Sequence, residues 1–196
     1  MSSKILFVAS ECAPIAKVGG LADVVGSLPK TLKKLGVDVS IVIPYYGSIS
    51  IKKEKIKIFS KELSVEFANK KENFSLYQTY LPESKVPVFL IKKDEYFKEG
   101  DVYLETDASS GGSEKEAKRF FFLTLAGIKT AQLINAEIIH CQDWQIALTP
   151  FLIKQKGIKN LKTLLTIHNL GYQGIYSSNI VNGLLGTNFS QDVNCL

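Results

Sequence analysis

The fold of this chain is decided by residues 4–44, which read KILFVASECAPIAKVGGLADVVGSLPKTLKKLGVDVSIVIP. The apolar run Ile5–Ser10 predicts a buried strand, and Val37–Pro44 predicts a second one. Between them, from Leu21 to Leu35, apolar residues recur at helical spacing. A strand, a helix and a strand in this order form a βαβ unit, so the two strands should be parallel and joined by a right-handed crossover.

The predicted helix carries a stop signal and an interruption. Lys33 and Lys34 suit its C-terminal dipole, and Gly36 suits the left-handed position that follows a helix. Pro29 lies inside the periodic run, where its ring removes a backbone donor and crowds the preceding turn. We therefore expect the helix to bend or to split at Pro29.

The middle of the chain has a different pattern. Lys57–Phe59, Leu63–Ala68 and Phe74–Tyr80 alternate only in part and are separated by polar turns such as Asn69–Asn73. They predict an antiparallel hairpin inserted beside the parallel sheet. Val86–Ile91 predicts a further buried strand.

The second half predicts more strand and helix alternation. Lys98–Gly112 is polar and rich in glycine and serine, which indicates an exposed loop. Ser113 and Glu116 then fit a capping box, so a long helix should run to about Asn135. The elements expected after it are a strand at Ile138–Cys141, a helix at Trp144–Lys156, a strand at Thr163–His168 and a loop from Asn169 with one helical turn near Ile180–Leu185. We predict one α/β domain over residues 1–196, with a Rossmann-like, doubly wound, mostly parallel sheet.

Composition excludes several classes of protein. The chain is 45% hydrophobic, which provides for a sizeable core and excludes disorder as the main state. Its 24 Lys and Arg against 19 Asp and Glu give a net charge of +5, which falls short of a nucleic-acid-binding signature. The run Ile5–Ala9 is too short for a membrane span or a signal-peptide core, so no membrane partner is expected.

Cysteine and histidine usage points to an interior without disulfides or metal. Cys12, Cys141 and Cys195 are an odd, scattered set, which predicts reduced thiols in a cytoplasmic protein. The only two histidines are His140 and His168, too few for an ordinary zinc site. We expect no metal ion and no cofactor.

The turn between the first strand and the first helix is a candidate anion site. Ligands of doubly wound sheets bind at the carboxyl ends of the strands, and a helix N-terminus there offers free N–H groups to a phosphate. Gly19 and Gly20 let a diphosphate approach the backbone, and Lys17 adds a positive charge. The dinucleotide and Walker glycine patterns are both absent from the sequence. The alternative is that the glycines merely make a tight turn and Lys17 is solvated.

Two further polar residues follow predicted strands. Asp143 would face a ligand there, or cap the helix that begins at Trp144 and stabilise it by about 1 kcal/mol, and both roles are compatible. A lone histidine after an apolar run, such as His168, is more often structural than catalytic. His140 is interpreted as buried structure.

Three motifs resemble one enzyme family. SECAP at residues 10–14, followed by KVGGLADVVGSLPK, is similar to the N-terminal signature of bacterial glycogen synthases and plant starch synthases. IHCQDW at residues 139–144 and TIHNLGYQG at residues 166–174 resemble two further segments of that family, as does the helix element AKRF at residues 117–120. The motifs occur in the family's order and spread over nearly the whole chain.

The resemblance implies a two-lobe glycosyltransferase with its active site in the cleft between two Rossmann-like lobes. The family transfers glucose from ADP-glucose to the non-reducing end of an α-1,4-glucan, with retention of configuration. The present chain would be the first lobe, and the C-terminal lobe, with the catalytic glutamate and the Arg/Lys pair that grip the phosphates, is absent from it. We therefore expect the chain to be inactive alone, with ADP-glucose, glycogen and the missing lobe as its partners.

The resemblance also implies roles for single residues. His168 would hydrogen-bond the transferred glucosyl ring, and Asp143 and Asn169 would line the reacting sugar. Lys17, Gly19 and Gly20 would belong to the donor or the acceptor side of the cleft. Asp23 of the glycine-loop motif is a further candidate substrate-binding residue. Four other candidates have two alternatives each, which follow from the residues themselves. Glu11 contacts sugar hydroxyls or holds the glycine loop, Tyr103 and Tyr172 stack on sugar or adenine or pack their loops, and Arg119 reaches a phosphate or pairs with Glu116 or Asp23.

Two other functions compete with this one. The chain would serve as a non-catalytic glucan-binding or regulatory module if it had lost the chemistry. The weaker alternative is an unrelated nucleotide-binding Rossmann domain.

Overall fold

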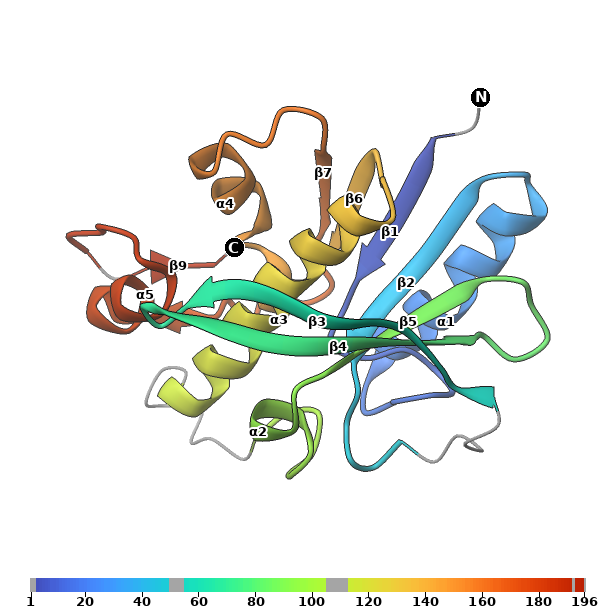
Figure 1. The fold of residues 1–196 in the computed structure, drawn as a ribbon, viewed down its shortest axis with the longest axis horizontal. Coiled ribbons are helices and arrows are strands. Elements are labelled where there is room, and N and C mark those ends of the chain that lie inside the picture. The colour runs from blue at the N-terminus through green and yellow to red at the C-terminus, as the bar shows by residue number, and fades with distance from the viewer. Residues whose placement is uncertain (1–2, 50–54, 105–112, 192, 196) are drawn as a thin grey trace.

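A computed structural model describes residues 3–49, 55–104, 113–191 and 193–195. Its main sheet has seven strands in the order β3-β4-β5-β2-β1-β6-β7, with helices packed on it (Figure 1). The parallel strands are β1 (Lys4–Val8), β2 (Asp38–Pro44), β5 (Pro87–Lys92), β6 (Ile138–Gln142) and β7 (Lys162–Thr166). The predicted fold class is confirmed: a doubly wound, mostly parallel α/β sheet with an antiparallel hairpin at one edge.

The two long crossovers run in opposite directions along the sheet. The first joins β1 to β2 through α1 (Gly20–Lys34), and the second joins β5 to β6 through α3 (Glu114–Leu133). Because both follow the right-handed rule, they place α1 and α3 on opposite faces. The central strands β1 and β2 are therefore covered on both sides, which explains their continuous apolar sequences.

Of the two outcomes predicted for Pro29, a bend or a split of α1, the structure excludes the split. The helix continues through Pro29 to Lys34, and the proline side chain is buried. Burial of the ring offsets the hydrogen bond that proline cannot make. Gly36 follows the helix with φ of +84°, as predicted for the stop position.

The predicted hairpin is longer than its sequence pattern indicates. It consists of β3 (Lys57–Phe67) and β4 (Lys70–Tyr80), and β4 pairs antiparallel with β5. The turn is confined to Ala68 and Asn69, with φ of +51° and +59°, so the segment 70–73 that was predicted as turn begins a strand instead. Register shifts between Ile58 and Leu63 break the alternation of β3, which is why its pattern appears only in part.

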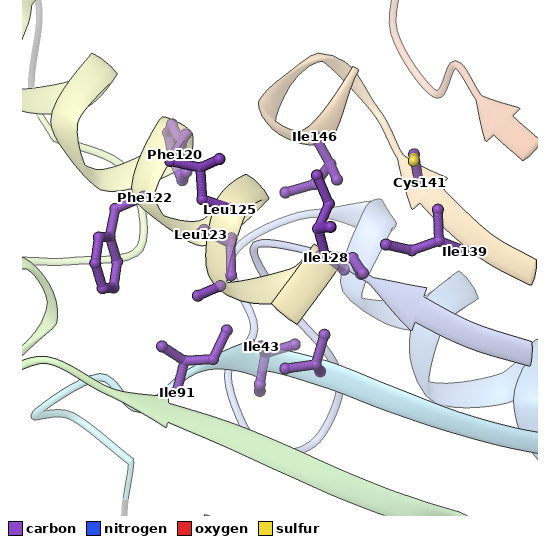
Figure 2. Packing of buried hydrophobic residues seen from close by; sticks show 14 of the residues in the cluster. Ile43, Ile91, Phe120, Phe122, Leu123, Leu125, Ile128, Ile139, Cys141 and Ile146 are labelled. Atoms are coloured by element: carbon purple, nitrogen blue, oxygen red, sulfur yellow. The ribbon is translucent and has the colours of Figure 1, made fainter. Parts of the chain in front are cut away.

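Helix α3 forms the centre of the core. Ser113 Oγ accepts the N–H of Glu116 at 3.2 Å, so the predicted N-cap is confirmed. Figure 2 shows Leu123 of α3 directed toward Ile43 of β2 and Ile91 of β5. Before it lie α2 (Asp94–Phe97), which was not predicted, and residues 98–104, which are irregular as expected; residues 105–112 of the predicted loop lie outside the described residues.

The segment after β6 is not the single helix predicted over residues 144–156. It forms a 3-10 turn, η2 (Trp144–Ile146), and then a separate helix, α4 (Thr149–Gln155). Pro150 explains the division, because proline is accommodated in the first turn of a helix and not in its interior. The end of the chain holds β8 (Ile175–Tyr176), α5 (Ser178–Leu185) and β9 (Val193–Asn194), where one helical turn was expected.

The two edges of the sheet differ in character. Edge strand β3 carries charged residues and the register shifts named above, which discourage pairing with another strand. Edge strand β7 is regular, and its Leu164 side chain is 52% exposed. Among the described helices, none combines the length and the apolar character needed to cross a membrane.

Candidate functional site

An open cavity of about 850 Å³ lies at the carboxyl ends of β1 and β6. Its walls come from the segments that follow β1, β6 and β7 and from the first turns of α1 and α3. This is the position at which doubly wound sheets bind ligands. The sequence-predicted site residues that line it are Glu11, Gly19, Gly20, Tyr103, Asp143, His168, Asn169 and Tyr172.

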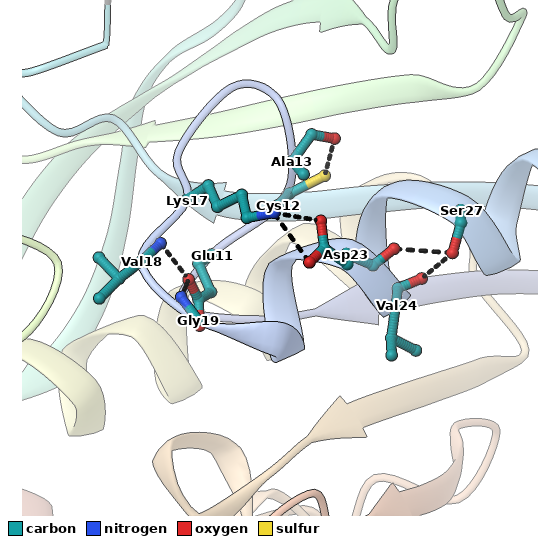
Figure 3. A network of polar contacts seen from close by, with 9 residues as sticks. All are labelled: Glu11, Cys12, Ala13, Lys17, Val18, Gly19, Asp23, Val24 and Ser27. Carbon is teal, nitrogen blue, oxygen red and sulfur yellow. Dashed lines mark hydrogen bonds and ion pairs between the residues drawn. The ribbon is translucent and has the colours of Figure 1, made fainter.

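Glu11 holds the glycine loop. Its side chain is almost fully buried, and Oε2 accepts the backbone N–H groups of Val18 at 2.7 Å and Gly19 at 2.9 Å (Figure 3). Oε1 accepts the Tyr103 hydroxyl at 3.0 Å, and that hydroxyl also contacts Ser10 Oγ at 3.1 Å. Burial raises the pKa of Tyr103, so its hydroxyl stays protonated and can donate to the carboxylate. Of the two roles predicted for Glu11, the structure shows the one in which its carboxylate holds the glycine loop.

The contact with Glu11 moves the candidate anion site one residue along the chain. The N–H of Gly19 is occupied, whereas Gly20, Leu21 and Ala22 form the first turn of α1, whose N–H groups have no acceptor within the helix. Gly20 lines the cavity, and a Cβ built on it would meet no atom within 4 Å. The open backbone at the helix start therefore begins at Gly20.

Lys17 and Asp23 lie outside the cavity lining and contact each other. Lys17 Nζ is 2.7 and 2.8 Å from the two carboxylate oxygens of Asp23 (Figure 3). Both side chains are at least half exposed, so the pair stabilises the fold by at most about 1 kcal/mol. The positive charge of Lys17 is thus paired with Asp23, which lies in the first turn of α1.

Asp143 combines the two roles predicted for it. Its carboxylate accepts the N–H of Trp144 at 3.0 Å, which caps η2, and the residue also lines the cavity. Its backbone has φ of +66° and ψ of −176°, a region that is strained for any residue with a Cβ. The N–H of Asp143 donates to the carbonyl of Thr166, the last residue of β7, at a distance of 2.8 Å. This hydrogen bond helps to hold the strained turn.

His168 is oriented by a residue that sequence reasoning missed. Its Nε2 is 2.9 Å from Oε1 of Gln142, the fully buried last residue of β6. An amide oxygen only accepts, so Nε2 of His168 is the donor in this contact. The signal in the sequence was the place of Gln142 at a strand end, directly before Asp143.

His140 is buried structure, as predicted. Its Nε2 lies 2.7 Å from the Thr166 hydroxyl, and its ring packs on Phe7. Burial, and secondarily the nearby His168, lowers the pKa of His140 to about 4. The ring is therefore neutral at physiological pH.

Arg119 does not reach the cavity. It is 2% exposed and donates to the backbone carbonyls of Tyr96 at 3.0 Å and Asp101 at 2.6 Å. Its guanidinium lies over the Tyr46 ring, 5.6 Å from the centroid. These contacts join α3 to α2 and to the segment before Tyr103, which is a role inside the fold.

Another wall of the cavity is formed by the segment that begins at Asn169, for which the sequence predicted a loop. Asn169, Tyr172 and Gly174 line the cavity, and Tyr172 is 62% exposed. Gly174 has φ of +60° and lies against Trp144, so that a Cβ there would come within 2.3 Å of the indole. The lining residues that the sequence did not mark as site residues include Glu116, Trp144, Gln145 and Tyr176.

Comparison with known proteins gives consistent results. The family of the starch synthase catalytic domain matches residues 4–195. Glycogen synthase of Kosmotoga olearia is 43% identical over 171 residues, covering 87% of this chain and 34% of that protein. Glycogen synthase of Thermotoga maritima is 41% identical over 182 residues, covering 88% of this chain and 36% of that protein.

A solved structure agrees over the whole length of the chain. The catalytic domain of starch synthase IV from Arabidopsis thaliana, bound to ADP and acarbose, superposes with a TM-score of 0.84 at 25% identity. The match covers 100% of this chain and 42% of that one. The chain thus spans about a third of the length of these curated relatives.

Proposed function

Because the chain belongs to the starch synthase catalytic domain family, we propose that it is the N-terminal lobe of an ADP-glucose-dependent glycogen synthase. The reaction is retaining glucosyl transfer to the non-reducing end of an α-1,4-glucan. The observation that carries the proposal is the cavity in which Gly20, Asp143 and His168 converge from three strand ends. Residues 1–196 form a single domain, and the rest of the active site comes from a second lobe.

The helix start suits the departing diphosphate. Negative charge develops on the leaving group, and donors that are already in place stabilise it without reorganisation. The N–H groups of Gly20 and Leu21 point from the first turn of α1, and the positive end of its dipole adds to their effect. Lys17 stands beside this turn and is released to the phosphates when its contact with Asp23 opens.

The opposite requirement is a positively charged, oxocarbenium-like sugar. Asp143 supplies a carboxylate in the cavity, and His168 supplies a ring whose orientation is fixed by Gln142. Asn169 follows directly and offers an amide to sugar hydroxyls. The Arabidopsis domain binds ADP and acarbose, which supports a nucleoside diphosphate and an oligosaccharide as the ligand classes here.

The interior is consistent with the reducing cytoplasm that we propose as the location. All three cysteines are buried and unbridged. Burial raises the pKa of Cys141 to about 11, so this thiol stays protonated and unreactive.

The test compares two polypeptides. One is the full-length product of the reading frame that contains residues 1–196, and the other is residues 1–196 alone. We expect the longer protein to transfer glucose from ADP-glucose into glycogen and the shorter one to be inactive. Equal turnover by residues 1–196 alone would show that no second lobe is needed. Glucan binding without transfer by the longer protein would favour the regulatory module instead.

A further inference from the structure

The cavity contains a buried carboxylate to which the proposed mechanism assigns no role. Glu116 lies in the first turn of α3, lines the cavity and is only 7% exposed. Its backbone N–H is satisfied by Ser113, so the cap of the helix does not require its side chain. Glu116 Oε2 instead accepts the hydroxyl of Tyr176, sixty positions later in the sequence, at 3.4 Å.

Tyr176 is the downstream anchor of one cavity wall. Its side chain is buried, with ring centroids 5.2 Å from Phe121 and 6.2 Å from Trp144. The wall itself is formed by residues 169–175, here called the cavity loop, and all of them except Leu170 line the cavity. The upstream anchor is the contact between His168 and Gln142.

The cavity loop is fixed mainly at its two ends, and at the downstream end Ile175 also pairs with Asn194 of β9. Its hydrogen bonds at Asn169, Gly171 and Tyr172 are made within the loop. Toward the rest of the fold, Cys195 donates to the Gln173 carbonyl at 3.2 Å, and Gly174 packs on Trp144. A surface segment that is fixed mainly at its ends opens locally when a contact at one end is lost.

We infer that Glu116 is a positioning residue, which acts through the Tyr176 hydroxyl to hold the cavity loop where its side chains meet the glucan acceptor. The inference rests on the proposed function for the identity of the ligand. The loop presents an amide and an exposed phenol ring, groups that suit neutral sugar hydroxyls and the apolar face of a sugar. A carboxylate at this wall repels phosphate, so the wall suits the glucan rather than the diphosphate.

The charge environment of Glu116 supports the contact. The groups that face it are Tyr176 from β8 and Arg119 from the next turn of α3. Burial raises the pKa of Glu116 above its usual range, and the Tyr176 hydroxyl opposes that rise by stabilising the ionised form. The ionised carboxylate is the stronger acceptor of the two forms.

The experiment uses the full-length protein and two readouts. Tyr176→Phe removes the hydroxyl and keeps the ring, and Glu116→Ala removes the acceptor. We expect each to speed amide exchange in residues 169–175 about tenfold and to raise the glucan KM by a similar factor, with kcat changed less than about twofold. Glu116→Gln, which still accepts the hydroxyl, retains most of the unaltered behaviour.

Matched controls separate positioning from stability. Ser113→Ala weakens the cap of the same helix without touching the contact, so it lowers the melting temperature and leaves exchange in the cavity loop unchanged. The double variant Glu116→Ala with Tyr176→Phe should behave like either single variant, because both remove one contact. Fully additive effects, or unchanged loop exchange in Tyr176→Phe, would overturn the inference. If the unaltered protein transfers no glucose, the proposed function fails, while loop exchange still tests the anchor.

Discussion

After β1 the chain enters α1 through Val18 and Gly19, whereas after β6 it enters η2 through Asp143. At the first turn, a carboxylate from Glu11, seven and eight residues earlier, accepts the two N–H groups, and the backbone at Gly19 is extended. At the second turn, Asp143 accepts the N–H of its own neighbour and adopts a strained backbone. Both turns border the same cavity.

The two turns differ in how they are held in place and in which backbone N–H groups they leave open to a ligand. The first turn is held from outside and leaves the N–H groups from Gly20 onward open to an anion. The second is closed on itself and depends on Thr166 of the neighbouring strand to stay in place. Changes at the second turn should therefore affect stability most, and changes at the start of α1 should affect binding most.

The largest effect is expected from Asp143→Ala. The substitution leaves the buried N–H of Trp144 without its acceptor and keeps a Cβ in the strained region, so we expect a loss of about 2–4 kcal/mol in unfolding free energy. Asp143→Gly loses the same acceptor but relieves the strain, and should be more stable than the alanine variant by about 1 kcal/mol. Urea denaturation measures both. Equal stability of the two variants would contradict a strained turn.

The second effect is a pH dependence from His140, which lies in β6, the strand that leads into this turn. The pKa of His140 is about 4 in the folded chain and higher when the chain is unfolded. The unfolded state therefore binds more protons between these values, so stability should fall as pH drops from about 6.5 to 4, by at most about 3 kcal/mol. His140→Gln should flatten this part of the profile in denaturation at several pH values. An unchanged slope would assign the proton uptake to another group.

A smaller loss is expected at the first turn from Glu11→Gln. The substitution replaces one carboxylate oxygen of residue 11 by an NH₂ group, which cannot accept a hydrogen bond. That group would face either the N–H of Val18 or the hydroxyl of Tyr103. We expect a loss of about 1–2 kcal/mol in unfolding free energy. Tyr103→Phe removes only the hydroxyl contact and should lose less in the same denaturation assay. A larger loss in Tyr103→Phe would mean that the tyrosine, and not the carboxylate, holds the loop.

The smallest effect on stability is expected from Gly20→Ala. A Cβ there meets no atom of the protein but projects from a residue that lines the cavity. We expect unchanged stability and about tenfold weaker ADP binding to the full-length protein by calorimetry. Gly183→Ala in α5, where a Cβ also meets nothing, is the matched control and should leave ADP binding unchanged. Equal ADP affinity in Gly20→Ala would remove the helix start from the phosphate site.

The sequence predicted those features that are encoded locally. The βαβ unit, the N-cap at Ser113 and the stop at Gly36 each depend on residues within a few positions of one another. The division at Pro150 was also local and was overlooked, because the apolar spacing continues across it. The continuation of α1 through Pro29 could not be predicted, because the sequence alone does not show that the proline ring is buried.

The sequence predicted which residues line the candidate site better than it predicted the contacts that those residues make. Motifs mark Glu11, Asp143 and His168, and parallel strands bring their ends together. The place of Arg119 depends on carbonyls of Tyr96 and Asp101, which no spacing in the sequence encodes. The same holds for Glu116 and Tyr176, which are sixty positions apart and meet only in the folded chain.

The regular outer edge of β7 has a practical consequence for handling residues 1–196. Within the described sheet its outer backbone groups face no further strand, and Leu164 stands exposed beside them. Such an edge is a template for self-association, which grows with concentration and with warming. A lysine in place of Leu164 would put a charge on this edge, and concentrated stocks of that variant should stay clear where those of the unaltered chain turn cloudy.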